Sequence, residues 1–570
     1  HSLSIGSNSL NSISSFPFYS IQTINSISIG SSSLNGLESF NINSFQSINQ
    51  LSIGSSSLNK LSSISFNSVN SLNRLTIGSN SLKGVKWIEL NGLNSVSVMV
   101  IESSSLRGIE TMRMGIVNRV TLSSFGISSC QSSSCMIMNE SSILGNMREF
   151  MVLNNGLNGM IQFKISGLSK LESVIIGNGS AQGVLSSDSV FSIENCSSLR
   201  SLVIGANAVV NYNRFELIGL NELSSFNYNS ILLSNVVSIR FSSIPLTSFL
   251  IGSNMFGSVR ELVLNEMSEL KSVVIGENSF RMSGVKRNDG LLKITNCGKL
   301  ESIELRNGSF EDYESIQLNG LVSLHNMIFG SRCFKYASSL SLDGLNGLRS
   351  IRFGSSSFSE TESLIIGSNS TLNDIVIGSG SLNGIHSLSI GSNSLNSISS
   401  FPFSSFPNVV TITIGSYSMN SIQLLSFNNL THTQSITLGS SSFQSVGVFE
   451  LANLMSLLTL SIGSNSLIAV TTIRLGTMNV GVLTSLGFTS SSSLTVFSLK
   501  NASVLPNVAT LEVLSNSFPN MNEFVVSGIE GLERLVIGDG SVVGSSANSE
   551  FRVENCSSLR SIKVGMNSIR

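Results

Sequence analysis

The sequence predicts a β-rich repeat solenoid with about 24 residues per turn, two short strands in each turn, parallel sheets and little helix. Three observations predict it. Short alternating apolar segments that end in glycine recur about every 24 residues. No segment has the apolar spacing of an amphipathic helix. The 570 residues exceed what one compact core holds, whereas a stack of turns adds core unit by unit.

The repeat is clearest near the beginning of the sequence. Residues 75–78 (LTIG) align with residues 51–54 (LSIG) and 27–30 (ISIG). The unit reads L-x-x-I-x-I-G-x-x-S-[LF], then variable residues, then a second alternating segment. Alternating apolar residues point to one face of a strand, so each turn is predicted to hold two short strands with their apolar faces in the core.

Two small residues recur at fixed places in the unit. The glycines that follow the first strand are expected to turn the chain with positive φ; they are Gly6, Gly30, Gly54, Gly78, Gly177, Gly354, Gly391, Gly439 and Gly538. The serines before the apolar residue that closes the turn are expected to stack and to satisfy buried backbone groups; they are Ser33, Ser57, Ser81, Ser105, Ser357 and Ser442.

The spacing stretches at four places, which predicts loops that protrude between the first and second strand of a turn. These insertions lie near residues 131–134, 185–189, 282–290 and 544–550. The longest concentrates charge, and we expect it to be a solvated loop; its charged residues are Arg281, Lys286, Arg287 and Asp289.

The domain organisation predicted for residues 1–570 is one continuous solenoid with a long internal duplication. HSLSIGSNSLNSISSFPF occurs at residues 1–18 and again at 386–403, and NCSSLRS occurs at 195–201 and 555–561. The second copy therefore starts near residue 386, just after a unit of only about 13 residues that begins at Leu372. Since the sequence begins and stops inside a repeat, we expect a longer array.

Composition excludes several classes of function. Charged residues make up 11% and the formal net charge is -1, so no basic surface for nucleic acid or anionic lipid is predicted. No apolar run is long enough to insert in a membrane. The four histidines do not lie at ligand spacing from other metal-binding residues, so we predict no catalytic residue, cofactor or metal site. Glu311 and Asp312 follow Phe310 into a turn and are expected to be solvated, without an acid/base role.

The six cysteines divide into two groups. Cys130 and Cys135 flank the first insertion and are a possible disulfide in an oxidising compartment; since Cys130 also falls at a core position, a buried free thiol is the alternative. The other four occupy Leu or Ser positions of the unit and are predicted to be buried small hydrophobes; they are Cys196, Cys297, Cys333 and Cys556.

Six sequons are possible N-glycosylation sites if the protein is secreted. They begin at Asn139, Asn178, Asn307, Asn369, Asn429 and Asn501. In a chain so rich in Asn and Ser, chance supplies as many, so this prediction depends on an extracellular location.

Hydroxyl side chains flank the buried apolar residue of many first strands. The pairs are Ser26/Ser28, Ser387/Ser389, Thr411/Thr413, Ser435/Thr437 and Thr459/Ser461. Flat hydroxyl ladders can bind ice or pack against an identical face. Interruption by Arg74, Val98, Val100, Glu304 and Arg352 disfavours ice binding. A nearly uncharged face favours self-association, because few charged groups are desolvated when two faces pack.

A family resemblance covers nearly the whole chain and is clearest in one segment. The pattern Cys297-x-x-Leu300-x-x-Ile303-x-Leu305, with Ser309-Phe310 after it, resembles the leucine-rich-repeat superfamily and most closely its BspA-like surface proteins. Gly replaces the usual Pro after the strand, and the typical Asn ladder is absent. The resemblance implies a right-handed solenoid with a parallel sheet on its concave face, and binding or adhesion in place of catalysis.

The function predicted from these observations is that of an extracellular or cell-surface structural protein. It would self-assemble with other copies, head to tail or laterally, into a filament or surface fibre. The alternative is a monomeric receptor or adhesin that binds a protein or glycan ligand on its concave face.

Overall fold

A computed structural model describes the chain in two compact units, residues His1–Leu270 (unit 1) and Lys271–Arg570 (unit 2). It describes all residues except 17, 19–23, 41, 43–46, 68, 70, 94, 107, 116, 118–126, 129–134, 140–145, 227–234, 282–286, 477–487, 490–495, 501–507, 516–517, 522, 545–548 and 570. The two units are taken in turn, and the prediction of one continuous solenoid with a duplication near residue 386 stays a prediction.

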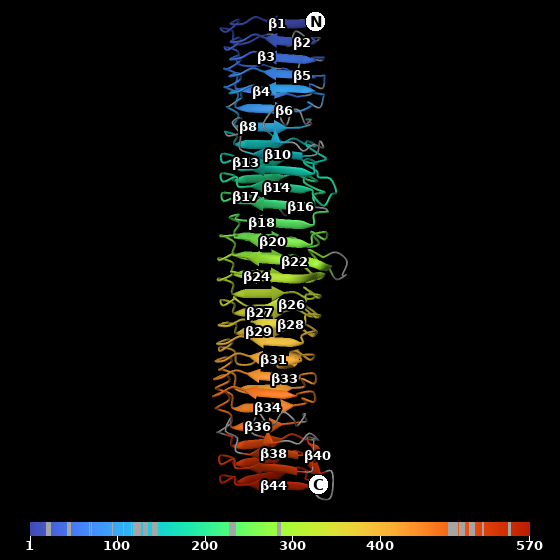
Figure 1. Cartoon of the computed structure of the whole chain (residues 1–570), viewed down its shortest axis with the longest axis vertical. Helices are drawn as coiled ribbons and strands as arrows, with labels where there is room; N and C mark the ends of the chain where they lie inside the picture. Colours follow the sequence, from blue (N-terminus) through green and yellow to red (C-terminus); the bar gives the residue numbers. More distant parts are fainter. Residues whose placement is uncertain are drawn as a thin grey trace. The chain divides into compact units, whose positions relative to one another are not determined.

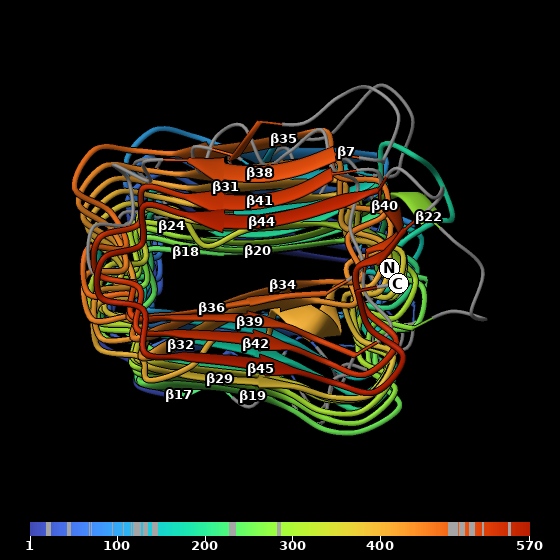
Figure 2. The same ribbon diagram turned by 90° about the horizontal axis from the view of Figure 1, so that it is seen from below.

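Unit 1 has two facing layers of short strands (Figures 1 and 2). One layer begins with the sheet β1 (Ser2–Ile5), β2 (Ser26–Ile29), β3 (Gln50–Ile53), β5 (Arg74–Ile77) and β7 (Val98–Ile101). It continues with β9 (Ile127–Ser128), β10 (Cys135–Asn139), β12 (Gln162–Ser166), β14 (Val190–Glu194), β16 (Arg214–Ile218), β18 (Ser238–Ser242) and β20 (Glu261–Asn265). The facing layer holds β4 (Ser63–Phe66), β6 (Trp87–Leu90), β8 (Thr111–Met114), β11 (Glu149–Val152), β13 (Ser173–Ile176), β15 (Ser201–Ile204), β17 (Ser225–Phe226) and β19 (Ser248–Ile251).

Unit 2 repeats this arrangement. One layer contains β22 (Arg287–Thr295), β24 (Tyr313–Asn319), β26 (Ser339–Ser341), β28 (Ser363–Ile366), β30 (Ser387–Ile390), β31 (Thr411–Ile414), β33 (Ser435–Leu438), β35 (Thr459–Ile462), β37 (Phe488–Thr489), β38 (Val496–Lys500), β41 (Glu523–Ser527) and β44 (Glu550–Glu554). The facing layer contains β21 (Ser272–Ile275), β23 (Ser302–Leu305), β25 (Asn326–Phe329), β27 (Ser350–Phe353), β29 (Asp374–Ile377), β32 (Leu424–Asn428), β34 (Val448–Ala452), β36 (Thr472–Leu475), β39 (Thr510–Val513), β42 (Arg534–Ile537) and β45 (Ser561–Val564). A small sheet pairs β40 (Pro519–Met521) with β43 (Val543–Gly544).

Successive turns pair in parallel and in register. Ser2 pairs with Ser26 and Ser26 with Gln50, one turn of 24 residues apart. Antiparallel pairing occurs, among the described strands, between β9 and β10 and between β37 and β38. The chain is thus a parallel β-solenoid of about 20 turns with about 24 residues per turn and almost no helix, which confirms the predicted fold class.

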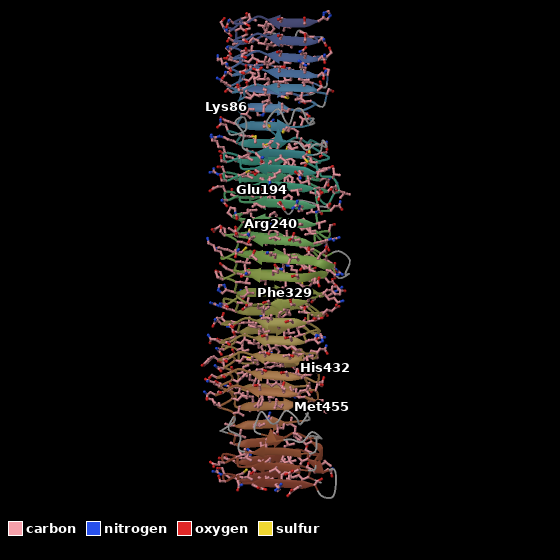
Figure 3. All side chains as sticks on the ribbon, viewed as in Figure 1. Lys86, Glu194, Arg240, Phe329, His432 and Met455 are labelled. Atoms are coloured by element: carbon pink, nitrogen blue, oxygen red, sulfur yellow. The ribbon has the colours of Figure 1, made fainter. Side chains whose placement is uncertain are left out.

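The core of each unit consists of inward residues stacked on their counterparts one turn away. In unit 2 the rings of Phe280, Phe310, Phe334 and Phe358 form a column, with successive centroids 4.6, 5.4 and 5.4 Å apart. Phe329, labelled in Figure 3, is 1% exposed and packs edge-on against this column. Such ring pairs stabilise the core beyond the contribution of the apolar area that they bury.

The role predicted for the glycines after the strands is wrong. None of the nine has a positive φ. The left-handed positions are the second and fourth residues after the glycine, such as Ser32 (φ 55) and Leu34 (φ 56) after Gly30. The glycines are required instead because adjacent turns touch there: a Cβ on Gly30 would lie 2.4 Å from the Ser7 backbone N.

The predicted serine ladder is confirmed. Ser33, Ser57, Ser81, Ser105, Ser357 and Ser442 are all 0 or 1% exposed. The Ser33 Oγ donates to the Gly6 carbonyl (2.7 Å) and accepts from the Ser9 N–H (3.1 Å). The same pattern recurs one turn later, where the Ser57 Oγ donates to the Gly30 carbonyl (2.8 Å). The ladder provides hydrogen-bond partners for backbone N–H and C=O groups of the corners, which are buried between stacked turns.

The short unit at Leu372 has a structural explanation. Gly378 follows β29 in one layer of unit 2, and Gly391 follows β30 in the other. The glycine corner therefore moves from one side of the turn to the opposite side. Each turn consists of two halves, each a strand and a corner, and either half can carry the glycine-serine motif.

The predicted insertions are described only in part. Residues 131–134 lie outside the described residues, as do most of those near 282–290 and 544–550. The insertion at 185–189 joins the corner after β13 to β14, and Leu185 is 70% exposed, as expected of a protruding loop.

Candidate functional surfaces

An uncharged hydroxyl face covers one sheet of unit 2. Its outward positions form two columns that cross the sheet in register. The columns are Ser339, Ser363, Ser387, Thr411, Ser435 and Thr459, and Ser341, Ile365, Ser389, Thr413, Thr437 and Ser461. Ile365 is the one interruption within these columns. We call this surface, made of the outward residues of β26, β28, β30, β31, β33 and β35, the hydroxyl face.

The hydroxyl face links neighbouring turns only weakly through its own side chains. The Thr459 Oγ1 donates to the Ser435 Oγ over 2.9 Å. Thr413 and Ser461 are exposed. Hydroxyls in this state can exchange water for hydrogen bonds with another surface.

The layer opposite the hydroxyl face carries charge at the corresponding positions. Glu450, Arg474 and Glu512 occupy one outward column, and the Arg474 Nε donates to the Glu512 carboxylate (2.9 Å). Glu304 and Arg352 also lie in this layer, on β23 and β27. They do not interrupt the hydroxyl face, contrary to the interpretation drawn from the sequence.

Unit 1 has a shorter version of such a face. Ser26 and Ser28 on β2 pair with Ser2 and Ser4 on β1. The same columns continue to Gln50 and Ser52, then to Arg74 and Thr76, then to Val98 and Val100. The predicted interruption by Arg74, Val98 and Val100 is therefore confirmed for this sheet.

The prediction that Glu311 and Asp312 are solvated is wrong. They are 1% and 0% exposed. The Glu311 carboxylate lies 2.8 Å from the Arg281 Nε and accepts from the Arg332 Nε over 3.0 Å. The turn keeps the Glu311 side chain inside because two guanidinium groups from neighbouring turns neutralise it.

The charged insertion therefore contributes to the packing of unit 2 through Arg281, whose side chain is 28% exposed. Asp289 is exposed at the start of β22. Lys286 and the side chain of Arg287 lie outside the described residues. The contacts of the Glu311 carboxylate with two guanidinium groups support an electrostatic role in the fold.

Cys196, Cys297 and Cys333 are buried, as predicted, whereas Cys556 is only half-buried, and none of the four is in a disulfide. Burial raises the pKa of Cys196 and of Cys333 to about 11, so neither thiol is an activated nucleophile. Cys135, at the start of β10, is buried and disulfide-bonded, and since Cys130 lies outside the described residues, its pairing with Cys130 stays a prediction.

Five of the six predicted glycosylation sites are described. Asn139, Asn178, Asn307, Asn369 and Asn429 are exposed, and Asn501 lies outside the described residues. The Asn178 Oδ1 accepts from the Ala206 N–H (2.9 Å) and the Asn307 Oδ1 from the Ser331 N–H (2.9 Å). These side chains link turns, and glycosylation stays a prediction.

An asparagine ladder was missed in the sequence. The Asn11 Oδ1 accepts from the Asn35 N–H (3.0 Å), and the Asn35 Oδ1 accepts from the Asn59 N–H (3.1 Å). In unit 2 the Asn396 Oδ1 accepts from the Asn420 N–H (3.1 Å). The signal in the sequence was an Asn directly after the apolar residue with positive φ, repeated every 24 residues. It lay in the part of the unit that was treated as variable.

A cavity of about 340 Å³ lies beside β32 in unit 2, and no sequence motif indicated it. Phe401, Phe403, Ile422 and Leu424 line it together with Asn428. Apolar and polar residues line it in equal number, and the Asn428 Oδ1 is buried without a hydrogen-bond partner.

The histidines lie apart in the fold. His325, His386 and His432 occupy different turns of unit 2, with His432 at the side of the stack in Figure 3. The His432 Nδ1 lies 3.2 Å from the Pro407 carbonyl. Within the described residues, no group of three His, Cys, Asp or Glu side chains could hold a metal ion. Over the same residues, no helix has the length and apolar character needed to span a membrane.

Comparisons with known proteins give no family assignment. No family model matches the chain, and no curated protein matches it.

Similar solved structures include a leucine-rich repeat protein from Bacteroides ovatus, at 11% identity, covering 79% of this chain and 87% of that chain with a TM-score of 0.19. They also include the circular leucine-rich-repeat protein CroV588, at 12% identity, covering 98% of this chain and 78% of that one with a TM-score of 0.19. A third is TLR13 in complex with ssRNA13, at 13% identity, 97% and 83% coverage and a TM-score of 0.20. These TM-scores are too low to support any conclusion about function, and the BspA-like branch stays a prediction.

Proposed function

We propose that this solenoid is a non-enzymatic structural scaffold of the leucine-rich-repeat type that associates with further copies of itself through the hydroxyl face. The observation that carries the proposal is the in-register, uncharged array on β26 to β35. The charged columns of the opposite layer make the two sides of unit 2 chemically distinct.

Burial of the hydroxyl face is inexpensive because it desolvates no charged side chain. Hydroxyl groups both donate and accept, so two identical columns can satisfy each other without a fixed pattern of donors. The hydroxyl faces of two copies are also flat and have the same strand spacing, so their columns can be aligned by shifting one copy along the stack.

The size of the face decides how strong one contact can be. Six strands at about 4.8 Å spacing and about 13 Å in width give an area on the order of 400 Å². Stable interfaces bury about 800 Å² on each partner. A single contact is therefore weak, and assembly depends on several such contacts acting together.

The proposed location is the cell exterior or surface, which suits the exposed sequons and the Cys130/Cys135 pair. The alternative function, a monomeric receptor or adhesin for a protein or glycan, makes a different prediction, because such a protein stays dispersed at high concentration.

The test is sedimentation velocity and electron microscopy of the whole chain over a range of concentrations. We expect concentration-dependent association that the double variant Thr413→Arg/Thr437→Arg abolishes, because it places two charges on adjacent strands of the hydroxyl face. The matched control is Thr472→Arg/Thr510→Arg, which places two charges on adjacent strands of the opposite layer. Dispersed monomers of the unsubstituted chain, or equal loss in both variants, would contradict the proposal.

A further inference from the structure

The hydroxyl face is regular in two directions. Its six strands pair in parallel without a register shift, so each outward column continues from strand to strand. Neighbouring hydroxyls within a column lie about 4.8 Å apart, and the two columns lie about 6.6 Å apart along the strands. The face is therefore a grid of hydroxyl groups with two fixed spacings.

Most hydroxyls of this grid are available to water. The Ser341 Oγ accepts from the Asp343 N–H over 3.3 Å, and the Thr459 Oγ1 donates to the Ser435 Oγ over 2.9 Å. Among the described residues, the other side-chain hydroxyls of the face bond no protein group. Since each hydroxyl both donates and accepts, the grid can hold water whose oxygens follow its spacing.

The spacing of the grid is close to that of ice. In ice each oxygen bonds four others tetrahedrally at about 2.75 Å, so two oxygens that share a neighbour lie about 4.5 Å apart. The strand spacing exceeds this by about 0.3 Å, and from the centre of six strands outward the mismatch grows to about 0.8 Å. The layers of ice repeat about every 7.3 Å, about 0.7 Å more than the separation of the two columns. Small side-chain rotations and the range of O···O distances in hydrogen bonds, about 2.5–3.0 Å, absorb differences of this size.

The objection to ice binding drawn from the sequence does not hold for this sheet. Of the interrupting residues, two lie in the opposite layer and three lie in unit 1. Ile365 is the one interruption, and it lies on β28, near one end of the sheet. The strands from β30 to β35 carry four unbroken ranks, Ser387/Ser389, Thr411/Thr413, Ser435/Thr437 and Thr459/Ser461.

We propose that the hydroxyl face binds ice, with the four ranks from β30 to β35 at the centre of the contact. Each hydrogen bond gains little in exchange for one with liquid water, but all ranks engage one rigid lattice at once, so the contacts act together. No charged outward side chain is present to hold water in a shell of its own.

Ice binding goes beyond the proposed self-association and uses the same surface, so the two activities compete for it. A single contact between two copies buries only about 400 Å² on each, about half of what a stable interface needs. Dilute chains therefore present the hydroxyl face free, and ice binding is expected to be strongest in dilute solution.

The test measures incorporation of the whole chain into ice that grows slowly, at a concentration where sedimentation velocity shows monomers. Growing ice pushes solutes without affinity ahead of it, whereas it overgrows a bound protein. We expect the concentration of the unsubstituted chain in the ice fraction to exceed that of a variant with a disrupted face at least tenfold. Recrystallisation of polycrystalline ice, measured in parallel, should be slower with the unsubstituted chain.

Two double variants separate the face from the rest of the molecule. Thr413→Tyr/Thr437→Tyr places two bulky rings on adjacent strands and holds the ice away from the other hydroxyls. The matched control is Thr472→Tyr/Thr510→Tyr, on adjacent strands of the opposite layer. We expect at least tenfold less incorporation of the first variant and unchanged incorporation of the control, with equal thermal midpoints. Ser389→Tyr, on β30, is a second variant if the first does not fold.

Exclusion of the unsubstituted chain from the ice would overturn the assignment. Equal incorporation of the two double variants would overturn it too, because the ice contact would then lie on another surface. The outcome is separate from that for self-association. A chain that stays monomeric at every concentration but enters the ice contradicts only the proposed function, and a chain that associates but is excluded from ice contradicts only the ice contact.

Discussion

Glycine marks the places where one turn of this solenoid touches the next. A Cβ at Gly415 would lie 2.4 Å from the Ser392 backbone N, closer than atoms can approach. Gly447, in the next turn, has its nearest neighbour 4.0 Å away. The same residue type thus has two different roles within one unit.

Gly415→Ala is expected to destabilise unit 2 by about 1–3 kcal/mol, because the two turns must move apart. Gly447→Ala is the control and should have a much smaller effect, because the added methyl group meets open space. Thermal unfolding followed by circular dichroism measures both. Equal midpoints for the two variants would show that the close approach is not required.

Serine at the corner satisfies backbone groups from two turns. The Ser418 Oγ donates to the Gly391 carbonyl (2.8 Å) and accepts from the Ser394 N–H (3.1 Å). Ser418→Ala leaves both groups buried without a partner, at a cost of about 1–3 kcal/mol. Ser418→Cys should cost less, because Cys333 occupies this position naturally and donates to the Arg306 carbonyl (3.1 Å). Chemical denaturation of both variants tests this order. A larger loss of unfolding free energy in Ser418→Cys than in Ser418→Ala would contradict it.

Glu194 makes stability depend on pH. Burial opposes its ionisation, but hydrogen bonds from Lys164 and Ser192 outweigh this effect and lower its pKa. The ion pair with Lys164 measures 2.7 Å. Since the folded pKa lies below the unfolded value of about 4.3, the contribution is complete above that value and is lost as the pH falls through the folded pKa.

We therefore expect Glu194→Gln to lower the thermal midpoint near neutral pH, and the difference from the unsubstituted chain to shrink as the pH falls below about 4. Glu222→Gln, at an exposed carboxylate, is the control. A difference that is constant with pH would exclude the ionised form of Glu194 as its source.

The half-turn is the structural element of this molecule. The sequence predicted a 24-residue unit with one glycine corner, because the motif stays in one phase over long stretches. Gly378 and Gly391, which end strands in opposite layers, show that the corner can occupy either side. The shortened unit at Leu372 contained this information, but spacing alone does not say which layer a strand joins.

Period and strand number were predictable because they depend on local alternation of apolar residues. The burial of Glu311 was not, because the two arginines that neutralise it lie about one turn away on either side and reach it only in the stack. The break in the sheet before β32 occurs where a 3₁₀ turn after Pro402 takes the place of a strand, and a missing strand leaves no repeated motif to recognise. Long-range pairing explains both failures.

The Arg281–Glu311–Arg332 cluster gives a prediction at the level of two neighbouring corners. Arg281→Met/Arg332→Met should destabilise unit 2 by about 3–5 kcal/mol, because the Glu311 carboxylate stays buried without a partner. Adding Glu311→Leu should recover most of this loss, since an apolar trio removes the uncompensated charge. Calorimetry of the double and triple variants decides it, and a triple variant no more stable than the double one would refute the electrostatic explanation.

At the scale of the whole molecule, the proposed assembly should respond weakly to salt. The hydroxyl face has no charged outward residue, so screening has little to act on. We expect the sedimentation profile to change little between about 0.01 M and about 1 M salt. Dissociation at the higher concentration would assign the association to charged surfaces, such as the column of Glu450, Arg474 and Glu512.

The interchangeable corners also affect how such a gene can change. A deletion of half a turn preserves the apolar alternation, the serine ladder and the parallel pairing, and only exchanges which layer receives the next hydroxyl strand. Selection for a binding surface and selection for a stable core then act on separate features of the same repeat. The chain can lengthen or switch its outward chemistry from one side to the other in small steps, each of which still folds.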